Sequence, residues 1–381
     1  MILELTADQK RLQDSAVEFA RGTLGRNMIA RDREETFDRD GWRACAAFGV
    51  MGMPVPAEYG GLGLGLTELI AVMEGLGYGS KDAGLIFSIN AHMWTVVVPL
   101  LLFGTEAQKR EYLPRLINGD LIGANAATEP DSGSDLFSLR TKAVKRDDGY
   151  VISGRKTFCT NAPVADLFML YATADPALGA RGLIAFLLES TTPGLTVSRP
   201  IDKMGLRTSP MGEVVLDECA VGTDRRIGRD GRGATIFDCS MEWERGCILA
   251  ACLGVMRRQL EDCIRYAGQR KQFGQSIGKY QSVANRIVDM KIRLETCRPL
   301  VYRIGAAKDA GRNARIESSL AKLHVSESFV ASSLDAMRTF GAYGYMTEQT
   351  LERDLRDSVG GLFYSGTSDI QRNIIARGLG L

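Results

Sequence analysis

The chain has 381 residues, of which 45% are hydrophobic and 24% charged, so it is long enough for two or three domains with substantial cores. Its 47 basic and 46 acidic side chains leave a formal charge of +1 without a long run of one sign. This balance disfavours nucleic acid and anionic membranes as partners, so we expect small molecules or proteins. The eight cysteines lack disulfide spacing, and the two histidines lack metal-ligand spacing; reduced, mostly buried thiols and no metal site are expected.

The first residues, MILELTADQKRLQDS, lack the basic and apolar regions of a signal peptide. We expect no apolar run to approach the roughly 20 residues of a transmembrane helix. The sequence therefore predicts a cytoplasmic protein that is not a membrane protein.

Residues 1–120 are predicted to form an α-helical domain, because apolar residues recur at spacings of three and four from Thr6 onward. Thr6, with Gln9 three residues later, is expected to cap the first helix. The glycine-rich stretch GGLGLG, Gly60 to Gly65, lacks the GxGxxG spacing of a dinucleotide site and predicts a turn into a helix.

Residues 121–229 change to short β-branched runs separated by turns, which predicts a middle β domain. Residues 230–381 return to long helical periods that are consistent with a four-helix bundle. The predicted order is α, β, α without alternation of strand and helix, so the expected fold class is α+β.

The helix predicted after the β domain carries a carboxylate, Glu244, in the middle of an apolar face. That face is formed by Phe237, Met241, Ile248, Ala251 and Val255. An isolated carboxylate costs several kcal/mol in apolar surroundings unless it is paired or neutral, so a raised pKa and a role as general base are one interpretation. The other interpretation is an ion pair between Glu244 and an arginine from another helix, and the residues alone slightly favour this second interpretation.

The residues beside Glu244 are expected to differ in role. Arg245 does not face its sequence neighbour on a helix and is freer to hold a ligand. Glu242 points elsewhere and is expected to be solvated.

Two further segments carry weaker signals. ATEPDSGSDL, Ala127 to Leu136, offers hydroxyls and backbone N–H groups suited to polar ring edges or phosphates, as many loops do. RKQFG, Arg270 to Gly274, could grip a phosphate and stack on a base, or be only the basic end of a helix.

Seven motifs follow one another along the chain: PAEYGGLGLG, ATEPDSGSDL, ISGRKTFCTN, DKMGLRTSP, RKQFGQSIGKYQ, GAYGYMTE and YSGTSDIQRNIIAR. In their order and spacing the chain resembles the acyl-CoA dehydrogenase family of flavoenzymes over essentially its whole length. The resemblance implies an acyl-CoA dehydrogenase-like fold, FAD as cofactor, and a homotetramer whose FAD sites are shared between subunits.

The resemblance also implies site residues, position by position. Those near FAD would be Thr128, Ser134, Phe158, Thr160, Arg270, Phe273, Gln281, Arg338, Gly341, Thr367 and Ser368. Arg270 and Phe273 would come from a neighbouring subunit. Those near the thioester substrate would be Ser134, Arg245, Gly366 and Arg377.

The chain departs from the family pattern at several positions. Phe158 stands where Trp is frequent, and Arg338, Ala342 and Tyr343 alter a stretch that more often reads Gln-x-x-Gly-Gly-Asn-Gly. In many members the residue before the Gly-Thr turn is the glutamate that removes the substrate α-proton, whereas Ser365 stands here and its hydroxyl is far too weak a base.

In a smaller branch, which includes isovaleryl-CoA and long-chain acyl-CoA dehydrogenases, the base is a glutamate followed by arginine on the helix after the β domain. Glu244 and Arg245 occupy that position. The apolar pattern and the resemblance therefore indicate the same catalytic residue, Glu244.

The implied reaction is the FAD-dependent α,β-dehydrogenation, or oxidation, of an acyl thioester. The YSGTS turn with the Glu-Arg helix also looks like the branch that oxidises prolyl groups held on peptidyl or acyl carrier proteins, which is the preferred interpretation. A short branched-chain acyl-CoA dehydrogenase is the alternative, and the acceptor could be an electron-transfer flavoprotein or oxygen. A non-dehydrogenating relative that uses FAD structurally is a further alternative, and the branch of the superfamily that binds nucleic acid is disfavoured by the balanced charge.

Overall fold

The computed structural model describes residues 4–381. The first part of this range is helical. Its helices are α1 (Ala7–Thr23), α2 (Met28–Glu34), α3 (Arg39–Ala47), α4 (Leu66–Gly79), α5 (Ala83–His92), α6 (Val98–Phe103) and α7 (Glu106–Ile117). The predicted cap of α1 is confirmed: the Thr6 hydroxyl accepts from the Gln9 N–H, and the Gln9 side chain accepts from the Thr6 N–H. The glycine-rich turn leads directly into α4, as predicted.

A π-helical turn, Met93–Val97, joins α5 to α6 into one helical stretch, Ala83–Phe103. By length and composition this stretch could cross a membrane. The expectation that no apolar run approaches this length is therefore wrong. The stretch lies inside the protein, where 83% of its most apolar window is buried. Met93 packs in the helical core and Val96 against the sheet, so the stretch joins the two.

The middle of the chain forms an eight-stranded sheet in the order β6-β7-β3-β2-β4-β5-β8, with β1 paired to β4. The strands are β1 (Gly123–Ala126), β2 (Lys142–Arg146), β3 (Gly149–Thr160), β4 (Leu167–Thr173), β5 (Leu183–Glu189), β6 (Leu195–Val197), β7 (Met211–Gly222) and β8 (Arg226–Ile227). The pairings of β4 with β1 and β2 are parallel and the others antiparallel. Along β4, Met169 and Phe168 pack in different apolar clusters, because successive side chains point to opposite faces.

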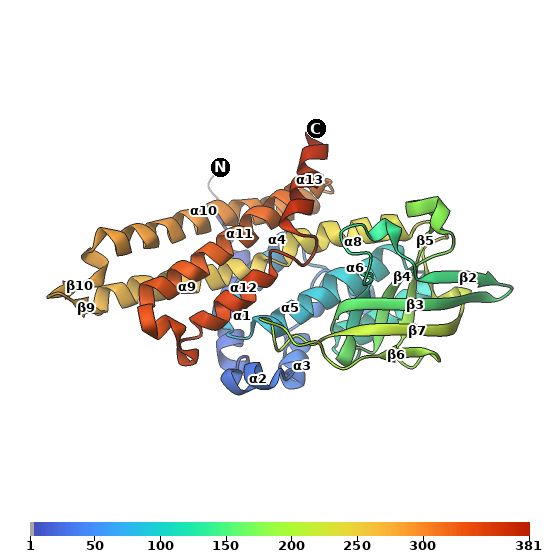
Figure 1. Ribbon diagram of the computed structural model, residues 1–381, viewed down its shortest axis with the longest axis horizontal. Coiled ribbons are helices and arrows are strands. Elements are labelled where there is room, and N and C mark those ends of the chain that lie inside the picture. The colour runs from blue at the N-terminus through green and yellow to red at the C-terminus, as the bar shows by residue number, and fades with distance from the viewer. Residues whose placement is uncertain (1–3) are drawn as a thin grey trace.

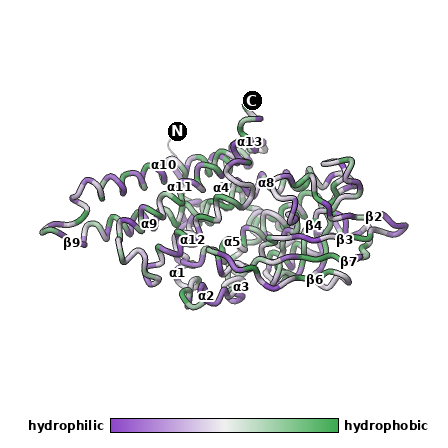
Figure 2. Tube along the Cα trace, viewed as in Figure 1, coloured by the Kyte–Doolittle hydropathy of each residue, from purple (hydrophilic) through white to green (hydrophobic). Residues whose placement is uncertain are grey.

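Helices return after the sheet. They are α8 (Gly233–Cys247), α9 (Ala250–Gln269), α10 (Gln281–Asp309), α11 (Arg315–Phe340), α12 (Leu351–Gly360) and α13 (Ser368–Gly378), with a hairpin of β9 (Lys271–Gln272) and β10 (Gln275–Ser276) after α9. Hydrophobic and hydrophilic residues alternate along these helices (Figure 2), as expected for amphipathic helices in a bundle. The β9-β10 hairpin lies at one end of the molecule and the sheet at the other (Figure 1).

The first and last helical regions share one core. Side chains of α1 and α4 pack in the same apolar cluster as those of α9, α10 and α11. Asp309, at the end of α10, accepts hydrogen bonds from the first N–H groups of α4, at 2.6 Å from Leu66 and 3.0 Å from Thr67. The observed fold class is therefore α+β with the predicted α, β, α order.

Candidate active site

A cavity of about 700 Å³ lies where the sheet, α5, α8 and the turn before α13 meet. The loop after β1 contributes Thr128 and Ser134 to its wall, and the end of β3 contributes Phe158 and Thr160. The opposite wall is formed by Met241, Glu244 and Arg245 of α8 and by the segment from Phe363 to Thr367. A volume of this size is typical of a small-molecule or cofactor site.

Glu244 lies in the last turn of α8, where the predicted apolar face is buried. The residue is 7% exposed, and its carboxylate forms no ion pair or hydrogen bond within residues 4–381. Burial raises the pKa of Glu244 to about 7, against smaller lowering effects of the Ser365 hydroxyl, Arg245 and Lys322. The ion pair considered from the sequence is thus absent, and the group is poised to exchange a proton near neutral pH.

Ser365 lies beside Glu244 on the same cavity wall, in a tight turn. Its φ is +56° and that of Gly366 is +90°, both in the left-handed region. The Ser365 hydroxyl is close enough to lower the pKa of Glu244, yet it makes no hydrogen bond of ordinary geometry and stays unpaired. The small serine side chain therefore leaves space on this wall, and Glu244 of α8 lies next to that space.

The turn is held by its carbonyl groups. Arg245 Nε donates to the Ser365 carbonyl at 2.9 Å, and Gln371 Nε2 donates to the Ser365 and Gly366 carbonyls at 3.2 and 2.9 Å. The Gly366 N–H donates no hydrogen bond to residues 4–381. Arg245, expected to be free for a ligand, thus already positions the turn, and the Gly366 N–H is left as a donor at the cavity wall.

The cavity brings together part of the predicted site. Its lining includes Thr128, Ser134, Phe158, Thr160, Glu244, Arg245, Gly366 and Thr367. The other predicted residues do not line it: Arg270, Phe273, Gln281, Arg338, Gly341, Ser368 and Arg377. Phe273 is 94% exposed on the β9-β10 hairpin, at the end of the molecule far from the sheet (Figure 1). One chain therefore supplies only some of the expected contacts.

Glu242 was predicted to be solvated, and this is wrong. The residue is 9% exposed, forms an ion pair with Lys308 and accepts the Ala314 N–H at 2.8 Å. The residue turns toward α10 and the start of α11, which a helical-face argument limited to α8 could not foresee.

The segment Lys203 to Leu206 is a part of the cavity wall that no sequence prediction assigned. It belongs to the motif DKMGLRTSP, which was the available signal. Leu206 adopts φ +50°, and Asp357 on α12 accepts its N–H at 2.5 Å. Burial raises the pKa of Asp357 to about 7.

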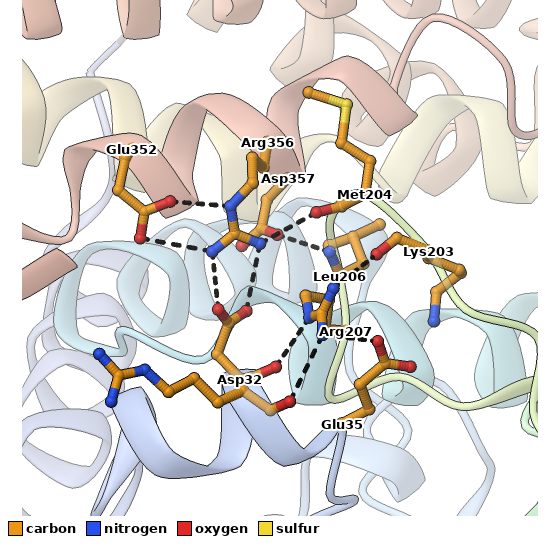
Figure 3. Close-up of polar contacts among 10 residues, drawn as sticks. Asp32, Glu35, Lys203, Met204, Leu206, Arg207, Glu352, Arg356 and Asp357 are labelled. Carbon is orange, nitrogen blue, oxygen red and sulfur yellow. Dashed lines mark hydrogen bonds and ion pairs between the residues drawn. The ribbon is translucent and has the colours of Figure 1, made fainter. Parts of the chain in front are cut away.

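Charged side chains hold this segment between α2 and α12 (Figure 3). Arg356 donates to the Met204 carbonyl at 3.0 Å and pairs with Asp32 at 2.6 Å and Glu352 at 2.8 Å. Arg207 Nε donates to the Asp32 carbonyl at 2.8 Å. One wall of the cavity is therefore fixed by the first and last helical regions together.

Three family models cover the chain. Residues 6–120, 124–219 and 231–380 match "Acyl-CoA dehydrogenase, N-terminal domain", "Acyl-CoA dehydrogenase, middle domain" and "Acyl-CoA dehydrogenase, C-terminal domain".

Curated and solved relatives resemble the chain over its full length. The "L-prolyl-[peptidyl-carrier protein] dehydrogenase" of Serratia sp. (strain ATCC 39006) is 42% identical over 381 residues, covering 100% of this chain and 99% of that protein. The solved "Prolyl Acyl Carrier Protein Oxidase AnaB" has 49% identity and a TM-score of 0.98, covering 99% of this chain and 100% of its own. A structure described as "PigA with FAD and proline" has 42% identity and a TM-score of 0.98, with both chains covered completely.

Proposed function

Because the chain belongs to the acyl-CoA dehydrogenase family, we propose that it catalyses FAD-dependent α,β-dehydrogenation of a prolyl group carried as a thioester on a carrier protein. Relatives named for prolyl carrier-protein substrates support this choice. The observation that carries the proposal is the state of Glu244. Its carboxyl is buried beside the cavity, has no ion pair among the described residues, and has a pKa raised to about 7.

The cavity fits a flavin ring. Phe158 presents a ring that is 60% exposed, held at φ +53°, to the cavity. Asn125 Oδ1 and the Ser365 hydroxyl are buried, unpaired polar atoms of lining residues and suit the polar edges of a ligand. Thr128, Ser134, Thr160 and Thr367 would hold FAD within one chain, and FAD bound there would accept the hydride that leaves the substrate β-carbon.

Glu244 removes the α-proton in this proposal. Above pH 7 its carboxylate is mostly charged, and the apolar surroundings leave it little hydrated and therefore strongly basic. Negative charge that develops on the thioester oxygen needs a preorganised donor, for which the unpaired Gly366 N–H is available. Arg245 keeps that turn in place through the Ser365 carbonyl.

The test is the Glu244→Gln variant, which keeps the shape of the side chain and removes the base. Bound FAD should be retained, while the rate of flavin bleaching by substrate in stopped-flow absorbance should fall by roughly 10² to 10⁴. Glu244→Asp, which shortens a carboxylate without removing it, should retain more activity than Glu244→Gln. Bleaching by Glu244→Gln at the parent rate would refute Glu244 as the base.

A substrate panel separates the carrier-bound prolyl group from short branched acyl-CoA. We expect prolyl-carrier protein to bleach the flavin, and isovaleryl-CoA to do so poorly. The opposite order would assign the chain to branched acyl-CoA oxidation. Oxygen consumption in the same turnover, with and without an electron-transfer flavoprotein, identifies the electron acceptor.

A further inference from the structure

Lys322, on α11, is a buried cation without a hydrogen-bond or ion-pair partner. The residue is 0% exposed, and its Nζ has no hydrogen-bond partner within residues 4–381. A buried ammonium that is neither paired nor hydrogen-bonded is costly to fold. Its position therefore needs a reason other than stability.

Packing on either side of Lys322 places it behind the wall of the active site that α8 and the turn before α13 form. One helical turn before it, Ser318 lies against α8: a Cβ on Gly246 would be 3.0 Å from the Ser318 hydroxyl. One turn after it, Ser326 lies against the end of α12, where a Cβ on Gly361 would be 3.4 Å from the Ser326 Cβ. Lys322 thus projects between α8, which carries Glu244, and the turn that carries Ser365.

The aromatic ring before Ser365 confirms this direction. Lys322 Nζ lies 6.0 Å from the centre of the Tyr364 ring, and Tyr364 itself lines the cavity. Phe87 also packs against this ring, at a centroid distance of 4.7 Å. Lys322 itself is fully buried and does not line the cavity, so its ammonium is not open to a ligand there.

Four structural elements supply the ionisable groups that interact electrostatically with Glu244. They are Arg245 on α8, Lys322 on α11, Tyr171 on β4, and Tyr364 beside the Ser365 hydroxyl in the turn before α13. Burial raises the pKa of both tyrosines above their ordinary value, so they stay neutral. The two cations are thus the charged groups around the carboxyl in the described chain, and Arg245 is engaged by the Ser365 carbonyl.

We propose that Lys322 is a positioning residue that keeps Glu244 in its charged, proton-accepting form. Burial favours the neutral carboxyl, and a fixed cation in the same low-dielectric wall opposes that preference. Burial and Arg245 lower the pKa of Lys322 to about 8, so the ammonium is still mostly charged at pH 7. The inference rests on the proposed role of Glu244 as the base.

The decisive experiment titrates Glu244 through protein stability, without substrate. The unfolding free energy of Glu244→Gln relative to its parent is measured against pH, once in the wild-type background and once in Lys322→Met. This difference changes with pH between the unfolded and the folded pKa of Glu244 and levels off above the folded pKa, so the pH of levelling reports the titration of Glu244 in the folded protein. We expect the pH of levelling to move up by about one unit or more in Lys322→Met; an unchanged value would overturn the proposal.

Three further variants make the comparison specific. Lys322→Gln gives the same measurement with a polar neutral side chain where Lys322→Met does not fold, and Lys322→Arg should return the pH of levelling toward the wild-type value. Lys308→Met is the matched control, since it removes a cation that pairs with Glu242, two residues from Glu244. A shift in Lys308→Met as large as that in Lys322→Met would also overturn the proposal.

The loaded enzyme gives a second readout. The pH midpoint of flavin reduction by substrate should rise in Lys322→Met, in the same direction as the pH at which the stability difference levels off. If no thioester reduces the wild-type flavin, the proposed function fails, while the stability titration still decides the role of Lys322.

Discussion

Glu244 should make the stability of the protein depend on pH in a direction opposite to most carboxylates. Its pKa is raised by burial from 4.5 to about 7. The folded state therefore binds more protons than the unfolded state between these values, and stability falls as pH rises through this window. Replacement by Gln removes that loss, so we predict that Glu244→Gln is more stable than wild type by roughly 3 kcal/mol at pH 8 and similar to it near pH 4.

Chemical denaturation at pH 4, 6 and 8 measures this difference directly. Asp357, whose pKa is also raised to about 7, is present in both proteins and cancels in the comparison. A difference between the two proteins that does not change with pH would show that Glu244 is not desolvated in solution.

At the level of single residues, the sequence predicted what a helical face can reveal. Glu244 interrupts an apolar stripe, and a period of 3.6 residues is enough to place it inside. The ion pair of Glu242 and the burial of Lys322 depend on which other helix packs against that surface. No spacing within one segment contains this information, because it arises from tertiary packing.

The segment Lys203 to Leu206 should lose its fixed position when the side chains in Figure 3 are removed. Arg356 links it to α2 through Asp32 and to α12 through Glu352. We predict that Arg356→Met lowers stability by about 1 to 3 kcal/mol, because it leaves a buried Asp32 carboxylate and the Met204 carbonyl without their donor.

Limited proteolysis and denaturant unfolding test this prediction. Cleavage near Met204, which is 58% exposed, should become faster in Arg356→Met. Arg303→Met, which removes an exposed arginine paired with Glu317, is the control and should change stability by less than about 0.5 kcal/mol. Equal behaviour of the two variants would mean that the segment is held by its own backbone.

Whole elements were predictable where a local rule decides them. The capping box at Thr6, the turn before α4 and the change from helical to strand periodicity are each encoded in a few adjacent residues. The π-helical turn Met93–Val97 and the β9-β10 hairpin were not predicted. The first continues a helical pattern without a break in composition, and the second is a pairing of two residues on each side, too short for an alternating pattern.

At the scale of the whole molecule, the predicted cofactor residues divide into two groups. Thr128, Phe158 and Thr160 line the cavity, whereas Arg270, at the end of α9, and Phe273, on the β9-β10 hairpin, lie at the other end of the bundle. Phe273 exposes 94% of its surface at φ +51°, which is unusual for a large apolar side chain unless another surface covers it. We predict that the hairpin of one subunit completes the FAD site of another.

Mixing two inactive variants tests this arrangement. Subunits with Glu244→Gln lack the base but keep the hairpin, and subunits with Arg270→Ala and Phe273→Ala keep the base but lack the hairpin contacts. In a hybrid oligomer, a site with the intact base of the hairpin variant and the intact hairpin of the Glu244→Gln variant is restored. The second site of the same pair carries both defects. If subunits exchange hairpins in closed, symmetric pairs, one of the two sites in each hybrid pair is intact. Co-expression should therefore recover up to about half of the parental activity per hybrid pair. Hybrids that form, as shown by two affinity tags purified in tandem, but stay inactive would mean that each chain completes its own site.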